Sequence, residues 1–214
     1  MTYETERALV CELGRRMWLR GWVAANDGNL SMRLPGGKLL ITPTGVSKGF
    51  LRPEMLLVMD KEGHILEQAE GYRPTTETAM HLACYRARPD IGGVCHAHPA
   101  AATAFACARL PIEKPILSEI AMTLGTVPVA PYGQSGTEEL PRAILPLLAE
   151  HEAVLLANHG ALTVGADLEQ AYYRMETVEH TAAIHLNARA LGGGVELTEE
   201  QQAALRPRGK ETEK

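Results

Sequence analysis

The chain has 214 residues, of which 45% are hydrophobic and 22% charged, and its formal net charge is −5. This composition is ordinary for a globular protein, and the charge argues against nucleic-acid binding, which needs a clustered basic surface. No run approaches the roughly 18 apolar residues of a membrane helix, and the charged residues 1–20 are not those of a signal peptide. No C-x-x-C pair occurs, so the sequence predicts buried, reduced thiols in a cytoplasmic protein. The cysteines are Cys11, Cys84, Cys95 and Cys107.

The first part of the chain predicts a helix followed by two hairpins. Residues 4–20 carry apolar side chains at helical spacing, and a glycine follows them. Residues 30–34 alternate between apolar and polar side chains, and Pro-Gly-Gly separates them from residues 38–42, which predicts a hairpin. Residues 56–59 and 64–66, joined by a polar turn, predict a second hairpin.

The rest of the chain alternates predicted helices and strands. Early hairpins nevertheless indicate antiparallel pairing, so we expect an α/β fold whose mixed or antiparallel sheet is flanked by helices. We expect one domain over residues 1–194, followed by a C-terminal helix and charged tail over 195–214. The predicted elements are a helix at 76–87, a strand at 91–96, a helix opened by Pro99, a strand at 126–129, a helix capped by Thr137, a strand at 153–157, and a long helix opened by Asp167 and Gln170 that ends at the glycines 192–194.

Three histidines lie where predicted buried strands end. Side chains alternate along a strand, so His96 and His98 project to one side. His159 follows the strand at 153–157. Three protein nitrogens with one open position are typical of a catalytic zinc site, whereas structural zinc takes four ligands and usually uses cysteine. Spacing alone leaves a second interpretation open, in which the three histidines are separate and merely hydrogen-bonded.

The segment Thr75-Thr76-Glu77 begins the helix predicted at 76–87. Hydroxyls and free backbone N–H groups at a helix N-terminus can bind a phosphate, and Glu77 could serve as a general base beside a metal. The alternative is an ordinary helix start, with a threonine N-cap and an acid favoured by the helix dipole. Residues 26–29 and 42–45 form two loops at the same end of a hairpin that could present N–H groups to an anion or be plain turns.

Other patterns predict no chemistry. Gly45-Val46-Ser47-Lys48-Gly49 fits the hydrolase pattern G-x-S-x-G, but Pro53 places the next helix start well past the serine. The sequence at 151–155 begins like H-E-x-x-H and lacks the second histidine. The remaining histidines have no evident partners, which favours surface or core roles for them. They are His64, His81, His151, His180 and His185.

Taken together, these segments resemble the class II aldolase/adducin family over about residues 5–191. The matching motifs are Gly28-Asn29-Leu30-Ser31, Thr42-Pro43-Thr44-Gly45, Thr75-Thr76-Glu77, His96-Ala97-His98, Ala130-Pro131-Tyr132 with Gly136-Thr137, and Asn158-His159-Gly160. The resemblance implies one Zn²⁺ per chain on the three histidines and Glu77 as the catalytic base. It implies a three-layer α/β/α domain with a mainly antiparallel sheet, and a homotetramer with active sites at subunit interfaces. The substrate phosphate would be held at Asn29, Thr44, Gly45, Thr75 and Thr76.

The activity that this resemblance favours is a zinc-dependent aldolase. It would cleave a phosphorylated ketose, of the fuculose 1-phosphate type, to dihydroxyacetone phosphate and an aldehyde. Fuculose-type aldolases supply an acid tyrosine from the neighbouring subunit, but residues 114–120 contain none, and Glu119 is the nearest replacement. Alternatives in the family are a pentulose-5-phosphate 4-epimerase, whose members carry Asp where this chain has Glu77, and a dehydratase or decarboxylase of sugar acids. An adducin-like module without catalysis ranks last, because the metal ligands are present.

Overall fold

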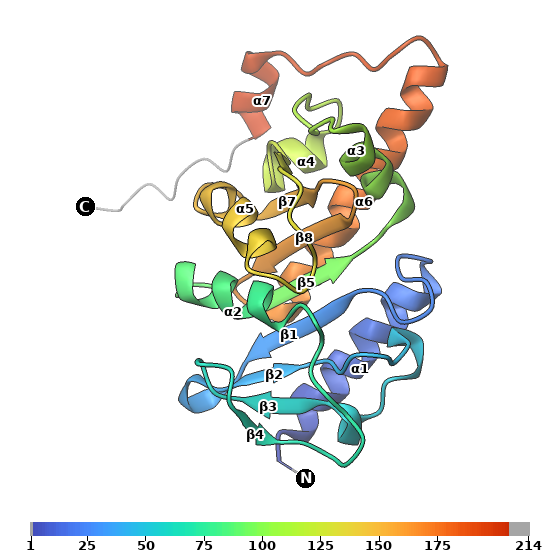
Figure 1. The fold of residues 1–214 in the computed structure, drawn as a ribbon. Coiled ribbons are helices and arrows are strands. Elements are labelled where there is room, and N and C mark those ends of the chain that lie inside the picture. The colour runs from blue at the N-terminus through green and yellow to red at the C-terminus, as the bar shows by residue number, and fades with distance from the viewer. Residues whose placement is uncertain (1, 206–214) are drawn as a thin grey trace, which may run out of the picture.

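A single mixed sheet runs through the centre of the computed structural model, which describes residues 2–205 (Figure 1). Over those residues it has eight strands in the order β4-β3-β2-β1-β5-β8-β7-β6. All neighbours are antiparallel except β6 and β7, which are parallel. The strands are β1 (Asn29–Arg33), β2 (Leu39–Ile41), β3 (Leu57–Met59), β4 (Ile65–Glu67), β5 (Gly93–Ala97), β6 (Val129–Ala130), β7 (Ala153–Leu156) and β8 (Gly160–Gly165).

Helices cover both faces of this sheet, which gives the three-layer α/β/α arrangement that the sequence predicted. One hydrophobic cluster joins one face to α1, α3 and α6. A second cluster joins the other face to α2 and α5. No helix in residues 2–205 is long and apolar enough to cross a membrane. The helices are α1 (Glu4–Leu19), α2 (Thr78–Ala87), α3 (Ala100–Ala108), α4 (Ser118–Thr123), α5 (Glu139–Leu148), α6 (Leu168–Ala190) and α7 (Glu199–Leu205).

Local sequence signals account for most of the element boundaries. Both predicted hairpins form, as β1–β2 and β3–β4. The Asp167 side chain accepts a hydrogen bond from the Gln170 N–H (2.7 Å), while the Gln170 side chain accepts one from the N–H of Ala166 (2.8 Å). These reciprocal bonds satisfy the free amides at the start of α6, so this predicted helix start is confirmed.

Some expectations differ from the structure. Helix α2 begins at Thr78 rather than at 76, β6 is shorter and later than predicted, and β8 and α4 were not predicted. Cys107 is exposed, so the prediction of a buried thiol is wrong there. Helix α3 buries its face through Ala102, Phe105 and Ala106, and position 107 points away from that face. The predicted tail over 206–214 lies outside the described residues.

Candidate metal centre and active site

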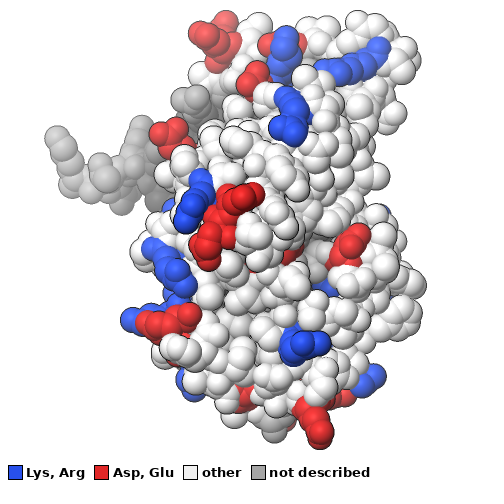
Figure 2. All heavy atoms as spheres, viewed as in Figure 1, with Lys and Arg blue, Asp and Glu red and all other residues white. Residues whose placement is uncertain are grey.

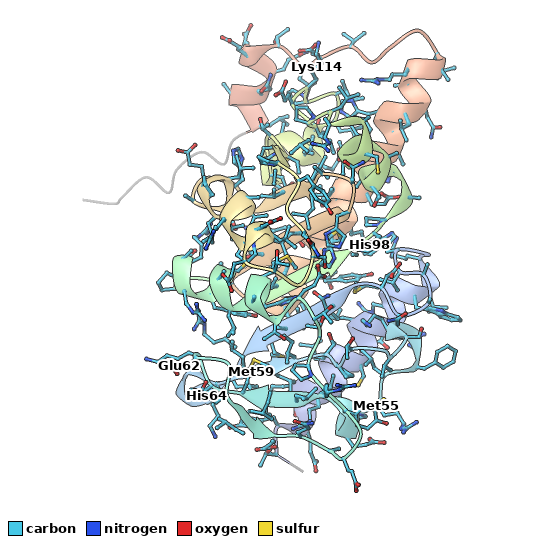
Figure 3. The ribbon with its side chains drawn as sticks, in the orientation of Figure 1. Met55, Met59, Glu62, His64, His98 and Lys114 are labelled. Carbon is cyan, nitrogen blue, oxygen red and sulfur yellow. The ribbon has the colours of Figure 1, made fainter. Side chains whose placement is uncertain are left out.

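The three predicted histidines meet at one end of the central strands. His96 lies in β5, His98 follows it directly, and His159 lies in the turn between β7 and β8. Because β8 pairs with both β5 and β7, this turn lies beside the end of β5. The ring centroids are 4.7 to 4.9 Å apart. Figure 3 shows His98 near the centre of the molecule, beside the end of β5.

The turn that carries His159 is specified by its neighbours. Asn158 has a left-handed backbone with φ 57°, a conformation that asparagine tolerates better than most residues. At Gly160 a Cβ atom would lie 2.5 Å from the carbonyl oxygen of Ala97 and 2.6 Å from Cδ2 of His98. The Asn-His-Gly sequence therefore allows the turn to approach His98 closely.

The segment after His98 is fixed as well. The backbone N–H of His98 donates to the backbone carbonyl of Trp22 (2.9 Å). The first N–H groups of α3, at Ala101 and Ala102, donate to the two carboxylate oxygens of Glu179 on α6 (3.0 and 2.8 Å). A carboxylate at a helix N-terminus satisfies free amides and the helix dipole. This contact anchors the chain immediately after the two histidines.

The ring orientations direct three nitrogens to a common point. His96 Nδ1 donates to the carbonyl of Ala161 (2.9 Å), so its Nε2 bears a lone pair when the ring is neutral. His98 Nδ1 lies 3.4 Å from the Asp27 carboxylate, which leaves its Nε2 3.1 Å from His96 Nε2. One ligand atom from each of the three histidines lies within 4.8 Å of the others. Lone pairs gathered beside a carboxylate repel one another unless a cation joins them, so the donor set fits a divalent metal.

Glu77 is buried directly beside these histidines. Oε2 accepts from Asn29 Nδ2 (2.8 Å) and lies 3.0 Å from His96 Nε2, while Oε1 accepts from the Ser135 hydroxyl (2.7 Å) and lies 3.4 Å from His159 Nε2. Burial raises the pKa of Glu77, but attraction to His96 and hydrogen bonds from His96 and Asn29 outweigh it and lower the pKa. The structure thus places an ionised carboxylate against the predicted metal ligands.

The pKa values of the three histidines are shifted in different directions. Burial lowers the pKa of His96, but attraction to Glu77 outweighs it, and the net shift is upward. Burial, followed by repulsion from His96, lowers the pKa of His98, and the same two causes lower that of His159 to about 4. In the metal-free cluster these shifts favour a proton at His96 and neutral rings at His98 and His159. A bound cation would displace that proton, because imidazole binds metals in its neutral form.

A cavity of about 150 Å³ opens beside Glu77 and His98. Four of the five predicted phosphate ligands line it, namely Asn29, Thr44, Thr75 and Thr76. The fifth, Gly45, follows Thr44 with φ +72° and open space around its Cα. Their two loops are joined by the bridge between Pro43 and Pro74. Figure 2 shows acidic and basic side chains interspersed over the viewed face of the molecule.

Lys48 is a lining residue that the sequence reasoning missed. It is buried, and its Nζ donates to the backbone carbonyls of Asn26 (2.9 Å) and Val46 (2.6 Å). Burial lowers its pKa to about 8, and Asp27 partly opposes this effect. Ser47 leads into a 3-10 turn over Lys48–Phe50 rather than into an α-helix, so the G-x-S-x-G pattern forms no hydrolase elbow here. In the sequence, the only indication of this lining residue was the lysine within Gly45-Val46-Ser47-Lys48-Gly49.

Glu119 lies apart from this cavity within its own chain. It is exposed on α4 and lines a different groove together with Arg20, Trp22 and His180. The three histidines and Glu77 come together as predicted, whereas a role for Glu119 requires another subunit. His81, to which the sequence reasoning gave no partner, contacts Asn29 next to Glu77.

Comparison with known proteins agrees with this geometry. The family model described as the Class II Aldolase and Adducin N-terminal domain matches residues 8–186. The chain belongs to this family. It is 36% identical over 169 residues to 3-oxo-tetronate 4-phosphate decarboxylase of Escherichia coli (strain K12), covering 77% of this chain and 78% of that protein. It is 32% identical over 181 residues to L-fuculose phosphate aldolase of Methanococcus maripaludis, covering 85% and 94%.

The fold has the same relatives. A solved structure of L-fuculose 1-phosphate aldolase superposes with a TM-score of 0.87 at 31% identity, over 96% of both chains. The enzymes named in these comparisons act on phosphorylated sugars or sugar acids. Class II aldolases use a divalent metal, and in this chain His96, His98 and His159 form the group that could bind it.

Proposed function

We propose that this protein is a metal-dependent decarboxylase of a phosphorylated 3-keto sugar acid, of the 3-oxo-tetronate 4-phosphate type. The products are CO₂ and dihydroxyacetone phosphate. The observation that carries the proposal is Glu77 packed among three convergent histidines, in a chain whose residues 114–120 lack the family tyrosine. The 36% identity to decarboxylases supports it.

The two candidate reactions demand different proton transfers. An aldol cleavage requires a group that removes the proton of a substrate hydroxyl as the aldehyde forms, and fuculose-type aldolases use a tyrosine at that step. Decarboxylation needs no such group, because CO₂ leaves without its own proton transfer. Residues 114–120 lack the family tyrosine, so the residues of this chain fit decarboxylation better than aldol cleavage.

The chain's own residues bind and orient the substrate and move one proton. Thr44, Gly45, Thr75 and Thr76 hold the phosphate through local donors, while the Asn29 amide donates to Thr75 and Glu77 at the edge of the same cavity. When the carbon–carbon bond breaks, its electron pair stays on the keto fragment as an enediolate. A divalent cation held by the three histidines would supply Lewis-acid stabilisation of that negative charge.

Glu77 then completes the reaction. A proton from solvent replaces CO₂ at the carbon, and it is delivered by the Glu77 carboxyl, which Asn29 and Ser135 orient. The proposal includes zinc as the metal, one ion per chain, because three imidazoles with an open position are typical of catalytic zinc. It also includes a cytoplasmic location.

A homotetramer belongs to the same proposal and rests on the family resemblance. In such an assembly, Glu119 would reach a neighbouring site, where the aldolase alternative, but not the decarboxylation, would need it as the replacement for the missing tyrosine. Size measurement in solution by light scattering tests the assembly, and a fully active monomer would contradict it.

The second candidate is the aldolase itself. It is favoured by the superposition on L-fuculose 1-phosphate aldolase over 96% of both chains. Cleavage of fuculose 1-phosphate and decarboxylation of 3-oxo-tetronate 4-phosphate leave the same enediolate, that of dihydroxyacetone phosphate. The metal ligands and Glu77 would serve both. A 4-epimerase is less favoured, because its relatives carry Asp at the position of Glu77.

The deciding experiment offers the purified holoprotein both substrates. CO₂ and dihydroxyacetone phosphate are measured from the keto acid, and dihydroxyacetone phosphate and the aldehyde from fuculose 1-phosphate. We expect equimolar CO₂ and dihydroxyacetone phosphate, lost on chelation and restored by zinc. A higher kcat/KM on fuculose 1-phosphate, without CO₂ from the keto acid, would establish the aldolase. Undiminished turnover by metal-free protein would exclude metal dependence.

A further inference from the structure

A row of buried polar side chains leads away from Glu77 toward α2. Asn29 Nδ2 donates to Glu77 Oε2 (2.8 Å), and Asn29 Oδ1 lies 2.5 Å from Nε2 of His81. His81 Nδ1 lies 2.5 Å from the hydroxyl of Ser31, which lies 3.0 Å from that of Tyr85. All five side chains are buried, with at most 6% of any residue exposed.

The chemistry of these groups fixes the direction of each hydrogen bond. The Glu77 carboxylate only accepts, so Asn29 turns its N–H toward it and its carbonyl toward His81. A carbonyl also only accepts, so His81 carries its proton on Nε2 and accepts at Nδ1 from Ser31. The Ser31 hydrogen is thereby used, and Tyr85 donates to the Ser31 oxygen. In each of the four hydrogen bonds, the donor is therefore the residue farther along the row from Glu77, and the acceptor is the residue nearer to it.

The row is suited to orientation rather than to proton conduction. Burial lowers the pKa of His81 to about 3, and it raises that of Tyr85, so both remain in their neutral forms near neutral pH. Between His81 and Glu77 stands an amide, which has no readily exchanged proton to pass along. The function of the row must then lie in the geometry that it imposes on Asn29.

We propose that His81 is a positioning residue for Glu77: its Nε2–H holds Asn29 in the one orientation whose N–H faces the Glu77 carboxylate. The other tautomer of His81 would favour a flipped amide, which would set the Asn29 carbonyl against the Glu77 carboxylate. Two acceptors at 2.8 Å without a hydrogen between them repel each other, and the buried carboxylate would lose a charge-assisted hydrogen bond. This role rests on the proposed function, in which Glu77 transfers a proton to the reacting carbon.

The tautomer can be measured without any substrate. In holoprotein labelled with ring ¹⁵N-histidine, NMR distinguishes an Nε2–H ring from an Nδ1–H ring and from a protonated one. We expect His81 to be neutral and protonated at Nε2 from about pH 5 to about pH 9, whereas an ordinary histidine titrates in that range. A ring protonated at Nδ1, or at both nitrogens near neutral pH, would overturn the inference.

Two substitutions test the consequence for the base. His81→Gln retains an N–H donor and an acceptor, while His81→Leu removes both. Because supporting partners around a site typically contribute ~10–100-fold to activity, we expect His81→Leu to lower kcat by that amount, with KM and zinc content near those of the wild type. His81→Gln should recover most of the loss. Thermal unfolding confirms that each variant is folded before it is assayed.

The matched control is His64→Gln, which makes the same substitution at an exposed histidine that contacts Asp60. Figure 3 shows His64 in the β3–β4 region, far from His98. This variant should match the wild type. Equal losses in folded His81→Gln and His81→Leu, or wild-type kcat in both, would overturn the positioning role. If the wild type turned over neither substrate, the proposed function would fail, and the NMR measurement would still decide the tautomer.

Discussion

Replacing Glu77 by glutamine isolates its chemical role from its structural one. Glutamine keeps the size of the side chain, and its amide oxygen can still accept from Asn29 or from Ser135, the two donors that hold the carboxylate at 2.8 and 2.7 Å. It cannot exchange a proton with carbon. A positioned general acid or base contributes ~10²–10⁴ in rate, which corresponds to about 2.7–5.5 kcal/mol of activation free energy. We expect kcat for release of dihydroxyacetone phosphate to fall by about 10²-fold or more.

The assay follows dihydroxyacetone phosphate by coupled reduction and measures zinc by elemental analysis in the same preparation. Zinc content should change little, because His96, His98 and His159 remain. Glu70→Gln, which makes the same substitution on an exposed side chain, is the matched control and should behave as the wild type. Wild-type turnover by Glu77→Gln would refute the assignment of the base. Loss of zinc together with activity would show that Glu77 is a metal ligand and not the proton-transferring group.

Three further perturbations follow from the geometry. Gly160→Ala should lower zinc affinity, because its Cβ would lie 2.6 Å from His98 Cδ2 and displace that ring; dialysis against graded chelator measures it. Thr44→Val and Thr76→Val should each raise KM about tenfold or more without loss of zinc, since a hydrogen bond to a charged group contributes roughly 1.5–3 kcal/mol; steady-state kinetics measure it. The folded protein holds the pKa of His81 at about 3, so below about pH 6.5 only the unfolded state binds this proton. The free energy of unfolding of metal-free protein should therefore fall by about 1.4 kcal/mol per pH unit as the pH drops from about 6.5 toward 3. Urea unfolding across that pH range, with His81→Gln for comparison, measures this slope.

Each of these expectations has a contrary outcome. Gly71→Ala is the control for Gly160→Ala, since it also adds a methyl group but meets no atom within 4 Å; equal zinc loss in both would dismiss the steric argument. An unchanged KM in both threonine variants would mean that the two loops are only turns. An identical acid slope in the wild type and His81→Gln would show that His81 titrates normally in the folded protein.

The sequence predicted the metal ligands from local pattern, and their meeting required the sheet. Alternation along β5 places His96 and His98 together, because a strand has a period of two. His159 reaches them only through the pairing of β8 with β5 and β7. Strand β8 was not predicted, so the residues alone left the metal site and three separate histidines as equal alternatives. The family motifs, rather than spacing, decided between them.

The misplaced start of α2 has a physical cause. The helix was predicted to begin at Thr76, directly after Thr75. The N–H of Thr75, however, donates to the carbonyl of Thr42 (3.2 Å), and its Oγ1 accepts from Asn29 and from the Glu77 N–H. These contacts between distant segments hold the backbone out of helical geometry until Thr78. Tertiary hydrogen bonds of this kind leave no periodic signal in the sequence.

Lys48 and His81 were missed for a related reason. A lysine in a glycine-containing loop and a lone histidine in a helix are most often surface or core residues, and nothing local distinguishes those cases. Both are buried here, and apart from Val46 beside Lys48 their side-chain partners lie more than 20 positions away in sequence. Polar residues buried at a site are recognised through their partners, which only the fold provides.

The site also accounts for why decarboxylases and aldolases share this family. Loss of CO₂ from the keto acid and loss of an aldehyde from the ketose phosphate leave the same enediolate. Three neutral imidazoles with a cation and one buried carboxylate are complementary to that common intermediate. The two reactions diverge only at the leaving group, which in the aldolase needs an additional proton-transferring side chain. If the proposed function holds, the residues around Glu77 would serve either reaction, and the group that selects the leaving group must lie elsewhere.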